Sequence, residues 1–197
     1  MEFKTQKSEE TRNRIIASAR KLFHEKGFEA VAVREIVEGA GCAKGTFYLY
    51  FETKMDLLNC IADMVFRGIF DIVDAELSTA DEDPFRQIDN IFEALQIYMQ
   101  KQEGSLKLLH THEMLELSLE NNISGAMIDA LIERIAEFIR CAVEKGHFRP
   151  VDAGLYARML FSMGHDMLES AMLFRFPADI GEVKEELRII MRKILEK

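Results

Sequence analysis

The chain has 197 residues, of which 48% are hydrophobic and 30% charged, a composition that supports a packed core and argues against a disordered chain. No stretch approaches the roughly 18 consecutive apolar residues of a membrane-spanning helix, and the polar first residues lack the apolar segment of a signal peptide. We therefore expect a soluble, cytoplasmic protein with no membrane partner.

The net charge of −9 is unevenly distributed along the chain. Residues 1–54 contain ten Lys/Arg and eight Asp/Glu, whereas the remainder contains fifteen and twenty-six. Because the acidic excess lies outside the first segment, the overall charge does not exclude nucleic-acid binding by that segment.

The cysteines point to a reduced protein. Cys42, Cys60 and Cys141 are odd in number and widely spaced, and none belongs to a Cys-x-x-Cys or Cys/His ligand pattern. The sequence therefore predicts neither a zinc site nor a disulfide framework.

Apolar spacing in the first fifty residues predicts three helices. The first runs from about Ser8 to Lys26 and stops at Gly27, a residue that adopts the left-handed conformation at little cost. Two short helices follow, over about 33–40 and 44–51. A longer helix followed by two short ones with a glycine-containing turn matches the helix-turn-helix arrangement.

The remainder is also helical by pattern. Thr53–Asp56 resembles a capping box, residues 78–83 form a polar loop, and Pro84 opens a new helix. We expect the later helices over 55–77, from 84 to a break near Gly104, and over 108–119, 127–145 with a stop at Gly146, 152–174 and 179–196. The fold class is all-α, with an N-terminal three-helix helix-turn-helix domain at 1–53 and a larger helical domain at 54–197.

Residues 27–58 contain an ordered set of glycines, aromatics and lysines. In chain order they are Gly27, Phe28, Val33, Ile36, Ala40, Gly41, Lys44, Gly45, Thr46, Phe47, Tyr48, Tyr50, Phe51, Lys54, Leu57 and Leu58. This segment resembles the DNA-binding signature of the TetR family of bacterial transcriptional regulators. The resemblance covers about a quarter of the chain. It implies a regulator that binds double-stranded DNA, with no catalytic residue, metal or cofactor.

The candidate DNA contacts lie on the second short helix and just after it. They are Lys44, Gly45, Thr46, Tyr48, Leu49, Tyr50 and Lys54. Phe47 and Phe51, four residues apart, should face the core. On the other side, Lys44 can neutralise a phosphate or donate to guanine, and the hydroxyl groups can donate to phosphate oxygens. Lys54 should attract phosphate at the start of the next helix.

Two positions depart from the family pattern. Ala32 stands where a Thr or Ser usually caps the second helix, and Ala43 stands where a Ser often opens the third. Each loss of a cap costs about 1 kcal/mol of local stability and removes a phosphate donor. We expect DNA binding to survive and to depend more on the remaining contacts.

The resemblance further implies a dimer through the last two helices and a ligand pocket in the second domain. Our candidate pocket residues are Phe66, Phe70, Phe92, Tyr98, Met99, Leu109, Met114, Ile135, Phe138 and Met163. Such Met and aromatic stripes are more often ordinary core, and the apolar stripes of the last helices can also be intrachain core. The pocket set suggests a hydrophobic or amphipathic effector, either a drug-like cation or an acyl compound, with acidic residues mildly favouring a cation.

The resulting hypothesis is a ligand-released repressor. A dimer would place its recognition helices about 34 Å apart on a near-palindromic operator. Ligand binding would shift the helix at 55–77 and lower the affinity for DNA. This mechanism requires that the ligand bind the DNA-free conformation more tightly than the DNA-binding conformation.

Two other functions are compatible with parts of the sequence. A helical carrier of hydrophobic ligands explains the apolar C-terminal helices but leaves Lys44–Phe51 unexplained. A helical enzyme would use the clusters His110, His112 and Glu113 or His165, Asp166 and Glu169. His165 and Glu169 are spaced for a shared helix face, but surface hydrogen bonding is the interpretation we prefer, and no catalytic spacing supports the enzyme.

Overall fold

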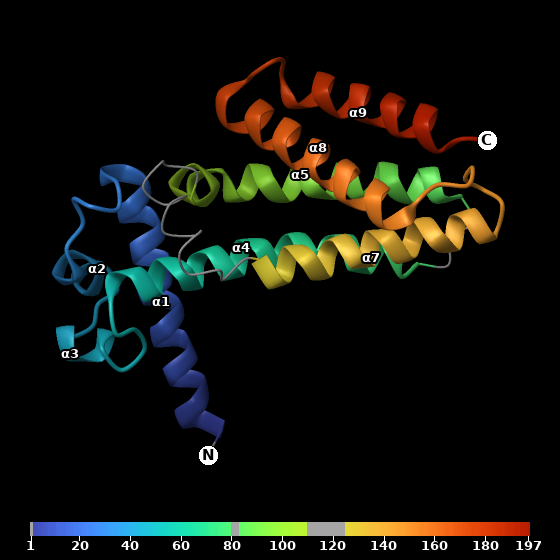
Figure 1. The fold of residues 1–197 in the computed structure, drawn as a ribbon. Coiled ribbons are helices and arrows are strands. Elements are labelled where there is room, and N and C mark those ends of the chain that lie inside the picture. Colours follow the sequence, from blue (N-terminus) through green and yellow to red (C-terminus); the bar gives the residue numbers. More distant parts are fainter. Residues whose placement is uncertain (1, 80–82, 110–124) are drawn as a thin grey trace. The chain divides into compact units, whose positions relative to one another are not determined.

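The computed structural model describes residues 2–79, 83–109 and 125–197, and within these ranges the chain is helical (Figure 1). The helices are α1 (Glu2–Lys26), α2 (Val33–Gly39), α3 (Lys44–Phe47), α4 (Lys54–Leu77), α5 (Pro84–Leu109), α7 (Gly125–Glu144), α8 (Ala153–Phe174) and α9 (Ile180–Leu195). The predicted all-α class is confirmed. Among the described residues, no helix is both long and apolar enough to cross a membrane.

The chain forms two compact units. Of the described residues, the first contains 2–65 and 104–109, and the second contains 66–79, 83–103 and 125–197. The first turns of α4 belong to the first unit because Leu57, Leu58 and Ile61 are buried in its core. The domain boundary at 53/54 stays a prediction, since α4 runs without a break through both units.

The core of the first unit joins α1, α2, α3 and the start of α4. Its buried members include Ile15, Ile16, Ala19, Phe23, Phe28, Val31, Ile36, Val37, Phe47, Phe51, Leu57 and Ile61. These residues recur at helical spacing, so burial of one face of each helix explains why the segments pack together. Gly27 ends α1 with φ +81°, as the sequence predicts.

Three helix boundaries differ from expectation. α1 begins at Glu2 rather than Ser8, because its first residues include the helix formers Glu2, Lys4, Gln6 and Lys7 but carry no apolar stripe from which the start could be predicted. α3 ends at Phe47, and the chain then closes with i→i+3 bonds from Leu49 N–H to Thr46 O and from Tyr50 N–H to Phe47 O. The third difference lies at Gly104.

The predicted break at Gly104 is wrong, because α5 continues to Leu109. A Cβ atom at Gly104 would lie 3.1 Å from Nδ1 of His24. The glycine therefore accommodates the close approach of the α1 side chain and does not end the helix. Most of the helix predicted at 108–119 lies outside the described residues.

Ion pairs join the helices of the second unit. Lys184 on α9 is buried and donates to Glu93 Oε1 at 2.7 Å and Gln96 Oε1 at 2.8 Å, both on α5. Arg188 Nε donates to Asp89 Oδ1 at 2.7 Å on the same pair of helices. These contacts fix α9 along α5, while α8 packs between α7 and α9.

Helix starts in both units follow the capping rules. Thr53 and Asp56 form the predicted capping box of α4, with Asp56 N–H donating to Thr53 Oγ1 at 3.0 Å and Thr53 N–H to Asp56 Oδ2 at 2.8 Å. Asp152 and Asp179 cap α8 and α9 with their carboxylates.

Candidate nucleic-acid interface and cavity

The turn between α2 and α3 is closed by backbone hydrogen bonds. Ala40 N–H donates to Ile36 O at 2.9 Å, and Cys42 N–H donates to Val37 O at 3.0 Å. Gly41 lies between them with φ +63°, a conformation that a residue without Cβ adopts without strain. This turn fixes the direction in which α3 leaves α2.

One side of α3 is buried and the other is exposed. Phe47 is fully buried and Phe51 is 5% exposed, with their ring centroids 5.7 Å apart, which confirms that these two residues face the core. Tyr48 and Leu49 are 51% and 79% exposed. Lys44 and Gly45 are also exposed and Thr46 is half-buried. The DNA-contacting role of these outward residues stays a prediction.

Tyr50 lies at the edge of this surface and contacts α1. Its hydroxyl is 3.0 Å from Ser8 Oγ, so a phosphate contact from Tyr50 would share that hydroxyl with Ser8. Nearby, the Arg12 guanidinium lies 5.6 Å from the Phe51 ring centroid and donates to Cys60 Sγ at 2.8 Å. These contacts join α1 to the residues that follow α3.

Lys54 has its donors engaged within the protein. Its ammonium donates to the carbonyl oxygens of Phe28 at 2.6 Å, Val31 at 3.0 Å and Glu29 at 3.3 Å. It also lies 4.3 Å from the Phe28 ring centroid. An ammonium has three N–H donors, so these carbonyls use all of them. Attraction of phosphate by Lys54 stays a prediction, acting through charge rather than a free donor.

The two alanines do occupy N-cap positions. Ala32 precedes α2 and Ala43 precedes α3, and neither provides a side-chain cap. At α2, Glu35 Oε2 accepts from Ala32 N–H at 3.0 Å. This backbone N–H and the ion pair with Lys26 lower the pKa of Glu35. Glu35 therefore supplies the half of a capping box that does not depend on the side chain at position 32, while the side-chain acceptor of a Ser or Thr cap remains absent.

The predicted pocket residues mostly have packing roles. Phe70, Ile135 and Phe138 contact one hydrophobic cluster of the second unit. Of the others, Phe92 and Met99 are buried, and Phe66, Tyr98 and Met163 are half-buried. Leu109 packs against the core of the first unit, and Met114 lies outside the described residues. As ligand contacts, all of them stay predictions.

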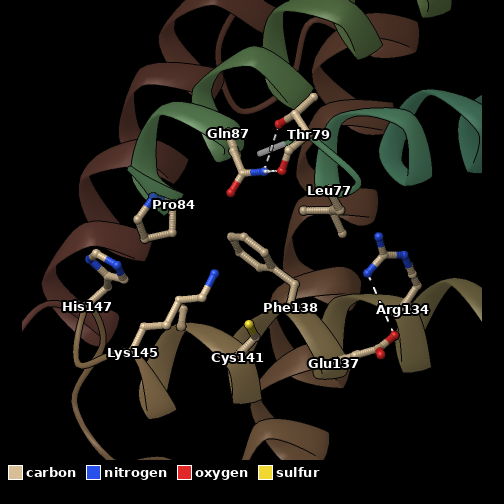
Figure 2. A pocket seen from close by; sticks show the side chains of 11 residues that line it. Leu77, Thr79, Pro84, Gln87, Arg134, Glu137, Phe138, Cys141, Lys145 and His147 are labelled. Carbon is tan, nitrogen blue, oxygen red and sulfur yellow. Dashed lines mark hydrogen bonds and ion pairs between the residues drawn. The ribbon is translucent and has the colours of Figure 1, made fainter. Parts of the chain in front are cut away.

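A cavity of about 660 Å³ lies in the second unit, where α4 and α7 end and α5 begins (Figure 2). Its lining residues are Leu77, Thr79, Pro84, Gln87, Arg134, Glu137, Phe138, Cys141, Ala142, Lys145 and His147. Only Phe138 was among the predicted pocket residues. The polar members were missed because their proximity depends on how three helix ends meet.

The His and Glu clusters give no metal site among the described residues. His165 Nε2 is 3.8 Å from Glu169 Oε2, and the His165 ring centroid lies 5.6 Å from that of Phe161. No group of three metal-ligating side chains occurs within the part of the chain that the structure describes. His110, His112 and Glu113 lie outside it.

Comparison with known proteins gives a consistent class. Residues 15–61 match the family described as bacterial regulatory proteins, tetR family. The chain is 23% identical to the HTH-type transcriptional regulator YfiR of Bacillus subtilis over 195 residues, which cover 92% of this chain and 90% of YfiR. Both matches are described as transcriptional regulatory proteins.

Solved structures share the fold. The TetR-family regulator PfmR of Thermus thermophilus superposes with a TM-score of 0.69 at 28% identity, covering 93% of this chain and all of PfmR. A transcriptional regulator from Saccharomonospora viridis, crystallised with choline, gives a TM-score of 0.78 at 20% identity, with 96% and 99% coverage.

Substitution of two lysines distinguishes a lysine that stabilises the fold from one that is only exposed. Lys54→Gln should lower the free energy of unfolding by about 2 kcal/mol, because hydrogen bonds from a charged donor are worth about 1.5–3 kcal/mol. Lys44→Gln, the same substitution on an exposed lysine, should change it by less than about 0.5 kcal/mol. Urea unfolding followed by circular dichroism measures both. Equal effects would contradict the structural role of Lys54.

Proposed function

We propose that the chain is a transcriptional regulator of the TetR family, which its matches to that family support. It represses transcription by binding a near-palindromic operator as a dimer, and a small molecule releases it. The observation that carries the proposal is the exposed side of α3. Burial of Phe47 on one side leaves Lys44, Tyr48 and Leu49 accessible on the other.

The chemistry of that side suits the major groove, which is wide enough to admit a helix. Lys44 supplies a cation for phosphate or guanine, and Gly45 allows close approach of the backbone. Thr46 and Tyr48 supply hydroxyl groups for phosphate oxygens, contacts that fix the register of the helix on DNA. The basic excess in residues 1–54 favours the same surface.

Dimerisation is supported by apolar side chains that α8 and α9 leave exposed. Leu155 and Met159 on α8 are 55% and 57% exposed, and Ile189 and Ile190 on α9 are 45% and 39% exposed. In contrast, Val183 and Leu187 on α9 are buried within the chain. The apolar residues of α9 thus divide, with Val183 and Leu187 in the intrachain core and Ile189 and Ile190 exposed. Exposed apolar groups on neighbouring helices are typical of a protein interface.

Release by a ligand is supported by the cavity in the second unit and by the continuity of α4 through both units. A ligand that binds the DNA-free state more tightly would shift the protein toward that state. We infer a hydrophobic or amphipathic effector, a class that fits the mixed lining of the cavity. The regulator from Saccharomonospora viridis, which shares the fold, was crystallised in complex with choline, a small organic cation.

A helical ligand carrier without a DNA role is the second candidate. It accounts for the cavity but leaves the exposed α3 residues without a purpose. A regulator accounts for both, and it acts in the cytoplasm, where bacterial operators are found.

Lys44→Ala and Tyr48→Ala should each weaken operator binding at least tenfold, because each removes a polar contact worth about 1.4 kcal/mol or more. The operator would be selected from random double-stranded DNA, and affinities measured by fluorescence anisotropy at two salt concentrations. Lys44→Ala should also reduce the salt slope by about one.

Lys21→Ala is the matched control, because Lys21 is an exposed lysine on α1 of the same unit. It should leave both affinity and salt slope nearly unchanged. Weak, salt-sensitive binding without a consensus sequence would favour the ligand carrier instead.

Met159→Glu and Ile190→Glu should shift the protein from dimer to monomer, because each buries a carboxylate in an apolar interface. Sedimentation velocity measures the change. Ile97→Glu on α5 is the control, since Ile97 is 53% exposed and lies on neither helix of the proposed interface. A monomeric parent protein, or dimers that survive both substitutions, would reject this interface.

A further inference from the structure

The cavity at the ends of α4 and α7 has the properties of a specific small-molecule site. Its volume of about 660 Å³ lies within the range of roughly 300–1,000 Å³ that ligand pockets occupy. Leu77, Pro84 and Phe138 give it apolar walls (Figure 2). Its few polar groups therefore determine which ligand it accepts.

Gln87 is held in one orientation by its neighbours. It is 4% exposed, and its amide nitrogen donates to Glu76 O at 3.0 Å and to Thr79 Oγ1 at 3.0 Å. Because the carbonyl of Glu76 accepts only, these bonds assign the NH₂ end of the amide. Figure 2 shows the opposite end, the Oε1 atom, directed into the cavity. This oxygen can accept a hydrogen bond from an N–H or O–H group of a ligand in the cavity.

Most charges around the cavity are compensated. Arg134 Nε donates to Asp74 Oδ1 at 2.6 Å, and its second terminal nitrogen donates to Ser78 Oγ at 3.0 Å. Glu137 pairs with Arg134 at 3.7 Å. The two carboxylates outnumber the guanidinium, so this side of the cavity carries one net negative charge, and an anion would have to lie at the other side.

Lys145 is the exception. Figure 2 shows its ammonium reaching into the cavity, and it has no hydrogen-bond or ion-pair partner among the described residues. Lys145 is an exposed residue, so solvent screens part of its charge. The apolar walls beside it still make its attraction for an anion stronger than that of a lysine surrounded by water on all sides.

At the ends of α4 and α7, several of the last carbonyl oxygens are already hydrogen-bonded, although a helix C-terminus keeps a partial negative charge. At the end of α7, the carbonyl oxygens of Cys141, Ala142 and Val143 accept from backbone N–H groups that follow the helix, at 2.9–3.2 Å. At the end of α4, Glu76 O accepts from the Thr79 N–H at 3.1 Å. These carbonyls are satisfied, so they do not present free acceptors to a bound carboxylate.

We propose that this cavity is the effector site and that it takes an amphipathic monoanion, a carboxylate attached to an apolar body. The carboxylate pairs with Lys145, and the apolar body lies against Phe138, Leu77 and Pro84. The inference rests on the proposed function, and it replaces the cation that the acidic composition mildly favoured.

Three ten-carbon probes with different head groups test the charge. Decanoate, decanol and decyltrimethylammonium, each below its aggregation concentration, would be titrated into the full-length protein by calorimetry. Decanoate should bind at least tenfold more tightly than either of the others. Tighter binding of decyltrimethylammonium would overturn the assignment of an anion.

Variants locate the site. Lys145→Gln should weaken decanoate binding about tenfold, whereas Lys101→Gln, on an exposed lysine of α5 outside the cavity, should leave it unchanged. Cys141→Trp, which fills the cavity from its lining, should abolish decanoate binding without lowering the melting temperature. Decanoate affinity that ignores both cavity variants would place the ligand elsewhere and reject the proposal.

Alkylation of Cys141 provides a second measurement of ligand binding, which is independent of calorimetry. Cys141 lines the cavity and is exposed, whereas Cys42 and Cys60 lie outside it. Saturating decanoate should slow alkylation of Cys141 by N-ethylmaleimide at least fivefold, by peptide mass spectrometry, and leave the other two rates unchanged. An unchanged rate at Cys141 would contradict occupation of the cavity.

Failure of this inference differs from failure of the proposed function. Operator binding without ligand, with no decanoate effect on Cys141, would reject the site and keep the regulator. Decanoate binding in the cavity without any operator would keep the site and reject the repressor.

Discussion

Burial of the Phe47 ring determines what the first unit can present to a partner. The ring is fully buried, and with Phe51 it fixes the rotation of a helix only one turn long. A helix of this length has little stability of its own, so packing rather than propensity must hold it. The same packing leaves Tyr48 and Leu49 outside. The proposed DNA contacts therefore depend on a core residue that touches no DNA.

Lys54 adds a polar constraint to this apolar one. By donating to three carbonyl oxygens between α1 and α2, it joins the loop before α2 to the start of α4. Arg12 on α1 likewise joins that helix to α4, by donating to Cys60 Sγ. The cation that the sequence pattern assigns to phosphate thus serves first to position the helices. Lys44 is instead exposed on α3, so its ammonium is accessible to a partner.

Local patterns predicted much of the fold. Helical periodicity located the long helices, Gly27 and Gly146 ended α1 and α7 as expected, and the capping box at Thr53 formed. The break at Gly104 was wrong because a glycine inside a helix pattern looks the same whether it ends the helix or accommodates a neighbour. The approach of His24 is a long-range contact that spacing along the chain does not encode.

The sites were predictable to different degrees. The exposed face of α3 follows from residues three and four apart, so the sequence indicated it directly. The cavity lining comes from the ends of three helices that are distant in sequence, and Lys145 and Gln87 carry no local signal. Composition therefore suggested apolar pocket residues, several of which, such as Phe70 and Ile135, are half-buried and pack against a hydrophobic cluster. Their contact with a ligand stays a prediction.

Hydroxyl-radical footprinting of the full-length protein, with and without its selected operator, tests the central claim most directly. The account predicts that DNA strongly reduces oxidation of Tyr48 and Leu49, while Phe176, which is 68% exposed in the second unit, stays equally reactive. Unchanged oxidation of Tyr48 in a saturated complex, with protection elsewhere on the chain, would show that α3 is not the element that contacts DNA.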